Sequence, residues 1–520
     1  MYRVNCSGKT NLEADACGIG FVATRGGLAN RGTVDFGIHL CAQFDHRGAP
    51  GHGSGVILDI PWSLMESRFP DYADRVQAKD VAVGAFFLPR DKNLYEECVR
   101  RIERVARSAG ADVLAWAEVP VELNALAEGS HARNSCPEIR HALFRHPEGL
   151  SNEGWFACRY LLRLAIEAAL EDLPTDEYSI LSLSNRTIVY KGLSELSRIA
   201  DFFLDLKRTD VESRFFLFHS RYCTNTTTAW SRAQPFWVLA HNGEISTIDG
   251  NTEWFRSIGA SLVDGISEQF PTLAPLADQV RSVICEGGSD SQVLDDMTIA
   301  LVASGLTMSQ SLLALLPEAR PAVLDERVRA FYESTSLYFG ACDGPAAVVA
   351  CDGDEAVAHL DRNGLRPLWF LSSPNYAIAL SELTGTFPTE EFSEQRILSP
   401  GETVRVDLLS GDVHPDEEVK REVAVRGFPN RPRKRAASKP TVKPRSAPWP
   451  DPLLQWPLAT IQAAFGMGKE DLDVLLAPMR KFGKAAVGSM GDDTSPSAIL
   501  DRYPRRPEDY FALRFAQETS

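Results

Sequence analysis

Residues 219–251 read HSRYCTNTTTAWSRAQPFWVLAHNGEISTIDGN. The apolar run at 214–222 overlaps the start of this stretch and predicts a strand with Arg221 at its end. Further along, LAHNGEI (239–245) places the amide of Asn242 and a glycine just after a second strand. Each feature alone has an ordinary explanation, because surface arginines form ion pairs and HNG is a common turn signal. Their chemical meaning therefore depends on the rest of the chain.

A second informative segment, ACGIGFVA, lies near the beginning of the chain at residues 16–23. It predicts a strand in which Gly18 and Gly20 allow the backbone to approach another group closely. A cysteine inside an apolar strand is usually an inert small hydrophobe. Position alone therefore does not make Cys17 a nucleophile, and other motifs must decide its role.

The composition is that of an ordinary globular protein, with 520 residues, 44% hydrophobic and 24% charged. This length predicts two to four domains. The net charge of −16 argues against nucleic acid or an anionic membrane as partner, because their phosphates would be repelled. No apolar run is long enough to span a membrane, and the first sixteen residues lack the apolar stretch of a secretory signal. We therefore expect a cytoplasmic protein.

Ten cysteines occur without a CxxC pair. This pattern fits neither a disulfide framework nor a zinc or iron–sulfur site, so reduced thiols and no metal site are expected.

Periodicity predicts an α+β core in which helices cover strand-rich stretches. Helices are expected mainly at 156–173, 194–206, 290–304 and 309–316. From residue 345 onward, turn signals predict a series of antiparallel hairpins. These turns are expected at Asp352-Gly353, at Asn363-Gly364 and near Gly411.

A basic, proline-rich segment follows the core. Residues 426–445 contain eight Lys or Arg, four prolines and no acidic residue. Proline and like-charge repulsion both disfavour compaction, so we expect a solvated linker or an arm over an acidic surface. An arm that binds nucleic acid is the alternative. It is disfavoured because stacking aromatics are not interleaved along the basic run and the rest of the chain is acidic.

Taken in order, the segments resemble the N-terminal glutaminase domain of the glutamate synthase large subunit. That domain is a class II glutamine amidotransferase with the N-terminal nucleophile hydrolase fold. Beside the two segments above, the resemblance rests on FDHRGA, YSILSLSNRTIVYKG, GGSDSQVLDDM, DGPAAVV, LDRNGLRP and PGETVRVD. It runs from about residue 16 to 410 and resumes at KAAVGSMGDDTSPSAIL and DYFALRFAQ, which resemble the join to a synthase body.

The resemblance implies stacked antiparallel sheets between two helical layers (αββα), with a small C-terminal helical extension. It also implies a cleaved propeptide at 1–16, an amidotransferase domain at 17–425, a basic linker at 426–450 and an extension at 451–520.

A chemical mechanism is implied as well. After removal of the propeptide, Cys17 would be the first residue, and its α-amino group, with an ordinary pKa of about 8, would serve as general base. The thiolate of Cys17 would attack the side-chain amide of glutamine, and the Asn242 amide and the Gly243 N–H would hold the oxyanion. Ammonia would leave, and water would hydrolyse the thioester.

Charged residues are expected to select the substrate. The resemblance assigns the α-carboxylate of glutamine to Arg221 and its α-ammonium group to Asp290, whose ordinary alternative is a helix cap. Further residues are expected to shape or line the pocket, namely Arg47, Tyr222, Thr224 and Asn225. His52 stands where relatives carry an aspartate, and a trimmed surface loop explains it better than a catalytic role.

Glutamate synthases continue into an FMN-binding barrel with an iron–sulfur cluster, whereas this sequence ends at Ser520. FMN and the cluster are therefore expected only in a partner. The preferred hypothesis is the L-glutamine-hydrolysing subunit of a split glutamate-synthase-like system that delivers ammonia to a separate FMN-bearing partner. Alternatives are a stand-alone glutaminase, an amidotransferase subunit for another acceptor, or a non-catalytic glutamine sensor, although a sensor would not need Cys17.

Overall fold

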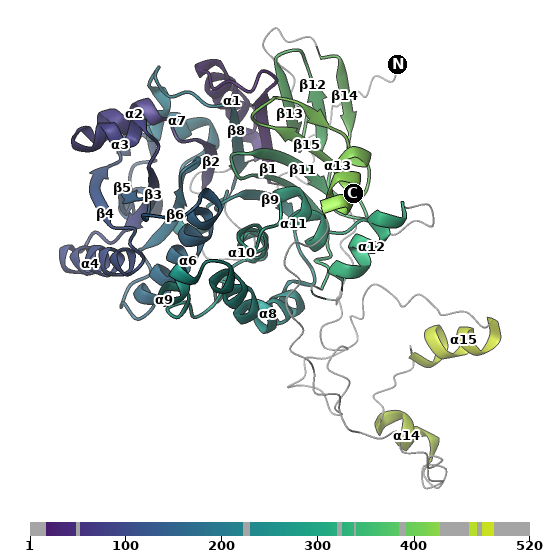
Figure 1. Ribbon diagram of the computed structural model, residues 1–520. Helices are drawn as coiled ribbons and strands as arrows, with labels where there is room; N and C mark the ends of the chain where they lie inside the picture. The colour runs from purple at the N-terminus through teal and green to yellow at the C-terminus, as the bar shows by residue number, and fades with distance from the viewer. Residues whose placement is uncertain are drawn as a thin grey trace. The chain divides into compact units, whose positions relative to one another are not determined.

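The computed structural model describes nine parts of the chain. These are residues 17–47, 53–221, 229–319, 325–336, 338, 340–383, 392–426, 457–464 and 471–482. The chain divides into two units, at 1–432 and 433–520 (Figure 1). The described elements of the second unit are α14 (Leu458–Ala464), a π-helical segment (Asp471–Leu476) and α15 (Ala477–Phe482). None of the described helices is long and apolar enough to cross a lipid bilayer.

The strands of the first unit form three antiparallel sheets. Their bounds are β1 (Gly18–Thr24), β2 (Ser54–Asp59), β3 (Val81–Leu88), β4 (Val113–Glu118), β5 (Glu138–Arg145), β6 (Ser179–Ser184), β7 (Thr187–Gly192), β8 (Phe215–Ser220), β9 (Leu239–Gly243), β10 (Ala346–Cys351), β11 (Glu355–Leu360), β12 (Trp369–Ser372), β13 (Tyr376–Leu380), β14 (Glu394–Ile397), β15 (Thr403–Asp407) and β16 (Val413–His414). A seven-stranded sheet has the order β14-β12-β13-β1-β8-β2-β7. A five-stranded sheet has the order β16-β15-β11-β10-β9, and a four-stranded sheet the order β4-β5-β3-β6.

The helices of the first unit vary widely in length. They are α1 (Arg31–Gln43), α2 (Trp62–Arg68), α3 (Ala73–Gln77), α4 (Lys92–Ser108), α5 (His131–Asn134), α6 (Asn152–Leu170), α7 (Ile199–Phe202), α8 (Ile248–Gln269), α9 (Ala274–Ala277), α10 (Asp290–Ala303), α11 (Met308–Leu315), α12 (Glu326–Thr335) and α13 (Asp416–Arg426).

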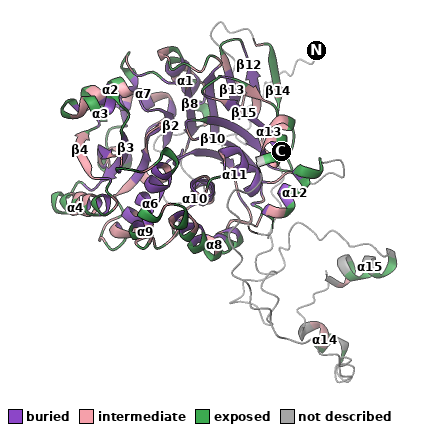
Figure 2. Ribbon diagram, in the orientation of Figure 1, coloured by how far each residue is buried: buried purple, intermediate pink, exposed green. Residues whose placement is uncertain are grey.

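The two larger sheets pack face to face, and helices cover their outer faces. Along β10, Ala347 and Val349 contribute to the core shared with the seven-stranded sheet, whereas Ala346 and Val348 contribute to the core beneath α10 and α11. This alternation is the period-2 pattern of a strand buried on both faces. Helix α1 packs on β1 and β8 from the other side, and the strands form the buried interior in Figure 2. The predicted α+β fold with αββα layers is confirmed.

Two expectations about local structure are wrong. The helix expected at 194–206 is a series of short turns around α7. The chain leaves helical backbone geometry at Phe203, and the rings of Phe202 and Phe203 are both buried. The turn at Asn363-Gly364 is present, with φ +64° at the glycine, but it joins two sheets and forms no hairpin. Strand β12 pairs with β13 and β14 and not with β11. The hairpins at Asp352-Gly353 and near Gly411 are confirmed.

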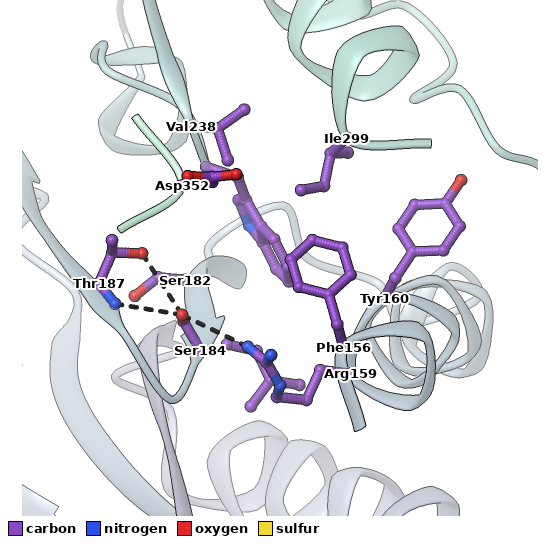
Figure 3. A pocket seen from close by; sticks show the side chains of 11 residues that line it. Phe156, Arg159, Tyr160, Ser182, Ser184, Thr187, Val238, Ile299 and Asp352 are labelled. Atoms are coloured by element: carbon purple, nitrogen blue, oxygen red, sulfur yellow. Dashed lines mark hydrogen bonds between the residues drawn. The ribbon is translucent and has the colours of Figure 1, made fainter. Parts of the chain in front are cut away.

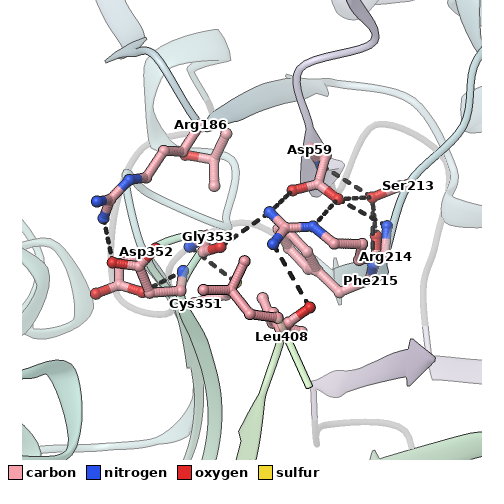
Figure 4. A network of polar contacts seen from close by, with 12 residues as sticks. Asp59, Arg186, Ser213, Arg214, Phe215, Cys351, Asp352, Gly353 and Leu408 are labelled. Atoms are coloured by element: carbon pink, nitrogen blue, oxygen red, sulfur yellow. Dashed lines mark hydrogen bonds and ion pairs between the residues drawn. The ribbon is translucent and has the colours of Figure 1, made fainter. Parts of the chain in front are cut away.

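A largely buried ion pair within the seven-stranded sheet also contacts the five-stranded sheet (Figure 4). Arg214, just before β8, contacts Asp59 at the end of β2, with 2.5 Å between Nη2 and Oδ1. The same guanidinium donates a 2.9 Å hydrogen bond to the carbonyl of Gly353 in the β10–β11 turn. Because the pair is shielded from solvent, salt screens it only weakly. Through the bond to Gly353, Arg214 links the start of β8 to the five-stranded sheet. The candidate site lies at the other end of that strand.

Candidate active site

Cys17 immediately precedes β1 in the middle of the seven-stranded sheet. Gly18 lies opposite Ser220 in the β1–β8 ladder, so continuing the antiparallel register by one residue places Cys17 opposite Arg221. The chain is tightly packed here, because a Cβ atom added to Gly18 would lie 2.4 Å from Cδ1 of Phe44. The glycine that follows Cys17 therefore allows the sheet to bury the cysteine.

Three charged groups act on the thiol of Cys17. Burial raises the pKa of Cys17, Arg221 and Arg366 lower it, Asp290 raises it, and the resulting pKa is about 11. The sulfur is therefore protonated near pH 7 in the chain as described. A neutral thiol is a poor nucleophile, so catalysis at this position needs a base close to the sulfur.

Asn242 lies at the end of β9 and points its amide at the nucleophile. Its Nδ2 atom donates a 2.9 Å hydrogen bond to the backbone carbonyl of Cys17. A carbonyl only accepts, so this contact requires the nitrogen of the amide, and not its oxygen, to face Cys17. An amide nitrogen carries two protons, which leaves the second N–H to bind another acceptor beside the cysteine.

Gly243 occupies a position that only glycine fits. Its φ is +136°, and a Cβ atom would lie 1.7 Å from the carbonyl oxygen of Pro345. That carbonyl already accepts a 3.0 Å hydrogen bond from the N–H of Glu244. The backbone next to Asn242 is therefore held in a left-handed conformation against β10.

We expect Gly243→Ala to lower the free energy of unfolding by about 3 kcal/mol or more, because it adds both a clash and backbone strain. Denaturant unfolding followed by circular dichroism measures the change. Gly250→Ala is the matched control, since a Cβ at this exposed position in α8 meets nothing within 4 Å. The control should be neutral or stabilising by about 0.5–1 kcal/mol, and an equal loss in both variants would contradict the prediction.

Asp290 is the first residue of α10, and the helix cap is its neighbour. Ser289 accepts the capping hydrogen bond from the N–H of Gln292, so the simple cap considered for Asp290 is not its role. The Asp290 carboxylate accepts a 2.9 Å bond from the N–H of Ile245 and a 2.7 Å bond from the N–H of Ser291. It thereby links the loop after β9 to the start of α10.

Arg221 combines a charged side chain with an unusual backbone. Its φ is +104°, and its N–H donates a 2.9 Å bond to the carbonyl of Gly53. A non-glycine residue in this region costs of order 1–3 kcal/mol, and such strain concentrates at functional sites. The strain turns the chain at the end of β8, where the arginine acts on Cys17.

The remaining predicted pocket residues are placed differently. Arg47 contacts Glu382, with 2.7 Å between Nε and Oε2, and this interaction lies just after β13, the strand that flanks β1. Burial raises the pKa of Glu382, but the hydrogen bonds from Arg47 and His46 outweigh it and leave that pKa below its usual range. Four positions lie outside the described residues, namely His52, Tyr222, Thr224 and Asn225.

The family profile for class II glutamine amidotransferases matches residues 17–428 of this chain. The chain belongs to the class II glutamine amidotransferases. The profile of the glutamate synthase central domain matches residues 460–520, and together the two matches confirm the resemblance drawn from the sequence. Hydrolysis of glutamine is the general reaction of this family, so the chain is an enzyme component of that type.

Curated relatives of this amidotransferase are glutamate synthases. The large chain of the NADPH enzyme of Azospirillum brasilense is 31% identical over 539 residues, which cover 100% of this chain and 35% of the relative. The ferredoxin-dependent glutamate synthase 1 of Arabidopsis thaliana is 33% identical over 535 residues, or 98% of this chain and 32% of the relative. The chain thus spans about a third of the length of these relatives.

Among solved structures, a glutamine phosphoribosylpyrophosphate amidotransferase from B. subtilis matches with 18% identity and a TM-score of 0.26. This match covers 44% of this chain and 40% of that one, and so low a score supports no argument.

Sequence reasoning missed a polar network behind Asp290 in this amidotransferase. His241, which precedes Asn242, is buried, and its Nδ1 lies 2.8 Å from Oγ of Ser291. The same Oγ accepts a 3.2 Å bond from Nε2 of Gln234, whose Oε1 accepts the N–H of His241. Burial lowers the pKa of His241, although Asp290 raises it. The neutral ring therefore buttresses the end of α10 that carries Asp290.

Arg366 is the second residue that sequence reasoning did not single out, although its motif LDRNGLRP was recognised. It lies between β11 and β12, where the chain crosses from one sheet to the other. Its positive charge lowers the pKa values of Cys17 and His241. The crossing, which the hairpin prediction did not anticipate, is what brings this charge to the cysteine.

Proposed function

We propose that the chain hydrolyses L-glutamine to L-glutamate and ammonia through a thioester on Cys17. The observation that carries the proposal is the 2.9 Å hydrogen bond from the Asn242 amide to the Cys17 carbonyl. It brings a preorganised donor beside the Cys17 thiol, in a site that also holds Arg221 and Asp290.

The proposed mechanism begins with removal of residues 1–16, which frees the α-amine of Cys17. An α-amine has an ordinary pKa of about 8, so it accepts the thiol proton near neutral pH. The thiolate then attacks the amide carbon of glutamine, and the second N–H of Asn242 and the N–H of Gly243 stabilise the oxyanion. The α-ammonium returns its proton to the departing ammonia. Water, deprotonated by the amine, cleaves the thioester and releases glutamate.

Recognition of a free amino acid needs two opposite charges at a fixed separation. We assign the α-carboxylate of glutamine to Arg221, whose planar guanidinium matches a carboxylate in a bidentate arrangement. The α-ammonium group is assigned to Asp290, which is held in place by the N–H groups of Ile245 and Ser291. Arg47 and the stretch around Tyr222, Thr224 and Asn225 complete the proposed pocket.

The direct test is incubation of the purified protein with L-glutamine, with glutamate and ammonia measured in equal amounts. A diazoketone analogue of glutamine should label the protein once, and peptide mass spectrometry should find the label on Cys17. Absence of turnover together with reversible glutamine binding would support the sensor alternative instead.

Asp290→Asn should raise KM for glutamine by about 10- to 100-fold with a smaller effect on kcat, because a charge-assisted bond to the substrate ammonium is lost in ground and transition state alike. An amide oxygen can still accept one of the two backbone N–H groups, so the fold should persist. Asp264→Asn, an exposed change on α8, is the control with the same loss of charge. Unchanged KM in Asp290→Asn, measured by steady-state kinetics, would refute the assignment.

We further propose that the ammonia passes to an FMN-bearing synthase body and that this chain holds neither FMN nor an iron–sulfur cluster. The support is the match of residues 460–520 to the glutamate synthase central domain. Purification from the native source under mild conditions tests the split-subunit form of the hypothesis. A separate flavoprotein should copurify, and its absence would leave a stand-alone glutaminase or another acceptor as the better account.

A further inference from the structure

Two buried arginines one turn apart on α6 have opposite surroundings. Arg163 is 4% exposed and contacts two carboxylates, with 2.7 Å from Nη2 to Oδ1 of Asp296 and 2.8 Å from Nε to Oε1 of Glu167. Arg159 is also 4% exposed. No carboxylate among the described residues pairs with it. Arg159 is therefore a buried cation without a counter-charge among the described residues.

The hydrogen bonding of Arg159 is weak. Its Nη1 atom lies 3.4 Å from Oγ of Ser184, and that oxygen already accepts the N–H groups of Arg186 at 3.0 Å and Thr187 at 3.2 Å. Nε of Arg159 is buried and has no partner in the described structure. The rings of Trp155 and Phe156 flank the guanidinium at 5.5 and 5.2 Å, but aromatic faces supply no hydrogen-bond acceptor of ordinary strength.

Electrostatics agree with this geometry. Burial and, to a smaller extent, the nearby charge of Arg186 together lower the pKa of Arg159 to about 9, so the group is still a cation at pH 7. The carboxylates around Arg163 instead raise the pKa of that arginine against its burial. A buried charge without a partner is costly, and the cost is relieved when an opposite charge enters the same site.

A small cavity borders the guanidinium (Figure 3). Its volume is about 20 Å³, and its walls come from α6, the β6–β7 turn, the start of β9 and α10, including Arg159, Ser182, Thr187, Trp237 and Ile299. A space of this size holds one water molecule or one monatomic ion. It is too small for phosphate or a nucleotide.

Asp352 also lines the cavity but does not neutralise Arg159. Its Oδ1 accepts the N–H groups of Asp354 at 2.9 Å and Glu355 at 3.0 Å. Burial raises the pKa of Asp352, the neighbouring Asp354 raises it too, and the cation that lowers it is Arg186. The Asp352 carboxylate therefore stabilises the β10–β11 turn, and the cation that acts on it is Arg186.

We propose that the cavity beside Arg159 binds a small monovalent anion of the size of chloride. The anion accepts hydrogen bonds from the guanidinium and supplies the counter-charge that the protein does not. It would stabilise the packing of α6 against the β6–β7 turn, and none of the residues assigned to glutamine hydrolysis takes part.

Two measurements on the full chain test this site. Replacing gluconate with chloride at constant ionic strength should raise the Tm of the wild type by at least about 2 °C, because a ligand that binds only the native state stabilises it. Arg159→Met should lose the chloride-dependent shift. Arg100→Met, which removes an arginine with 69% side-chain exposure, should keep it. The same Tm in both salts, or an undiminished shift in Arg159→Met, would overturn the proposal.

A crystal of the wild type soaked in bromide provides a second readout that needs no variant. We expect an anomalous peak within hydrogen-bond distance of the Arg159 guanidinium. A water molecule at that place, with no anomalous signal, would overturn the proposal whatever the melting data show. Because neither experiment uses glutamine, a failure here leaves the proposed hydrolysis untouched, and a failure of hydrolysis leaves this site untouched.

Discussion

Cys17→Ala should abolish glutamine hydrolysis, with kcat reduced on the order of 10⁶-fold, as when a covalent nucleophile is removed from other hydrolases. Without the sulfur no thioester can form, and the oxyanion donors then have no intermediate to stabilise. Ammonia release by the purified variant measures the loss. Cys136→Ala is the control. It removes a different free thiol, which unlike Cys17 is partly exposed, and the variant should keep wild-type kcat.

The reactivity of Cys17 should also depend on whether residues 1–16 are present. In the unprocessed chain the pKa of this buried thiol is raised to about 11, so its rate of alkylation by iodoacetamide should rise about tenfold per pH unit up to that value. Chain beginning at Cys17 has a free amine, and its alkylation should level off at lower pH. Intact mass identifies the two forms. Full activity in a chain that retains residues 1–16 would contradict the amine-base mechanism.

Asn242→Ala should lower kcat by about 100- to 1,000-fold while KM changes much less, because an oxyanion donor acts mainly in the transition state. The native amide already touches the Cys17 carbonyl at 2.9 Å, so its position needs no rearrangement before the reaction. Steady-state kinetics on glutamine measures the effect.

Two further variants make the Asn242 test specific. Asn242→Asp keeps the shape but replaces a donor with an acceptor, so it should be at least as inactive as the alanine variant. Asn93→Ala, an exposed change on α4, should have normal kinetics. A rise in KM at unchanged kcat in Asn242→Ala would show that the amide binds substrate and does not stabilise the transition state.

Much of the local structure could be predicted from the sequence. The strand after Cys17, the strand that ends before Arg221 and the start of the helix at Asp290 follow from apolar runs, glycines and capping residues only a few positions apart. The turn at Asp352-Gly353 also follows from its own residues. Each of these predicted elements is present, because the local signals and the burial of its apolar residues favour the same structure.

Other local predictions failed because packing overrode them. At 194–206 two adjacent phenylalanines are buried together, and the chain leaves helical backbone geometry at the second of them, Phe203. At Asn363-Gly364 the turn is present, as its residues predict. The strand that follows, β12, pairs with β13 in the seven-stranded sheet and not with β11. A turn determines the direction of the chain over a few residues, whereas strand pairing depends on which edge the next apolar face can cover.

For this amidotransferase, the sequence by itself determined the identities of Cys17, Arg221, Asn242 and Asp290 and the short elements that carry them. Only the tertiary structure decided how they meet. The contact between Asn242 and Cys17 joins residues 225 positions apart, and it exists because β1 and β9 lie in two sheets that pack face to face. The crossing that brings Arg366 to the cysteine and the contrast between Arg159 and Arg163 arise in the same way. Burial and opposite charge depend on neighbours distant in sequence, which local patterns do not encode.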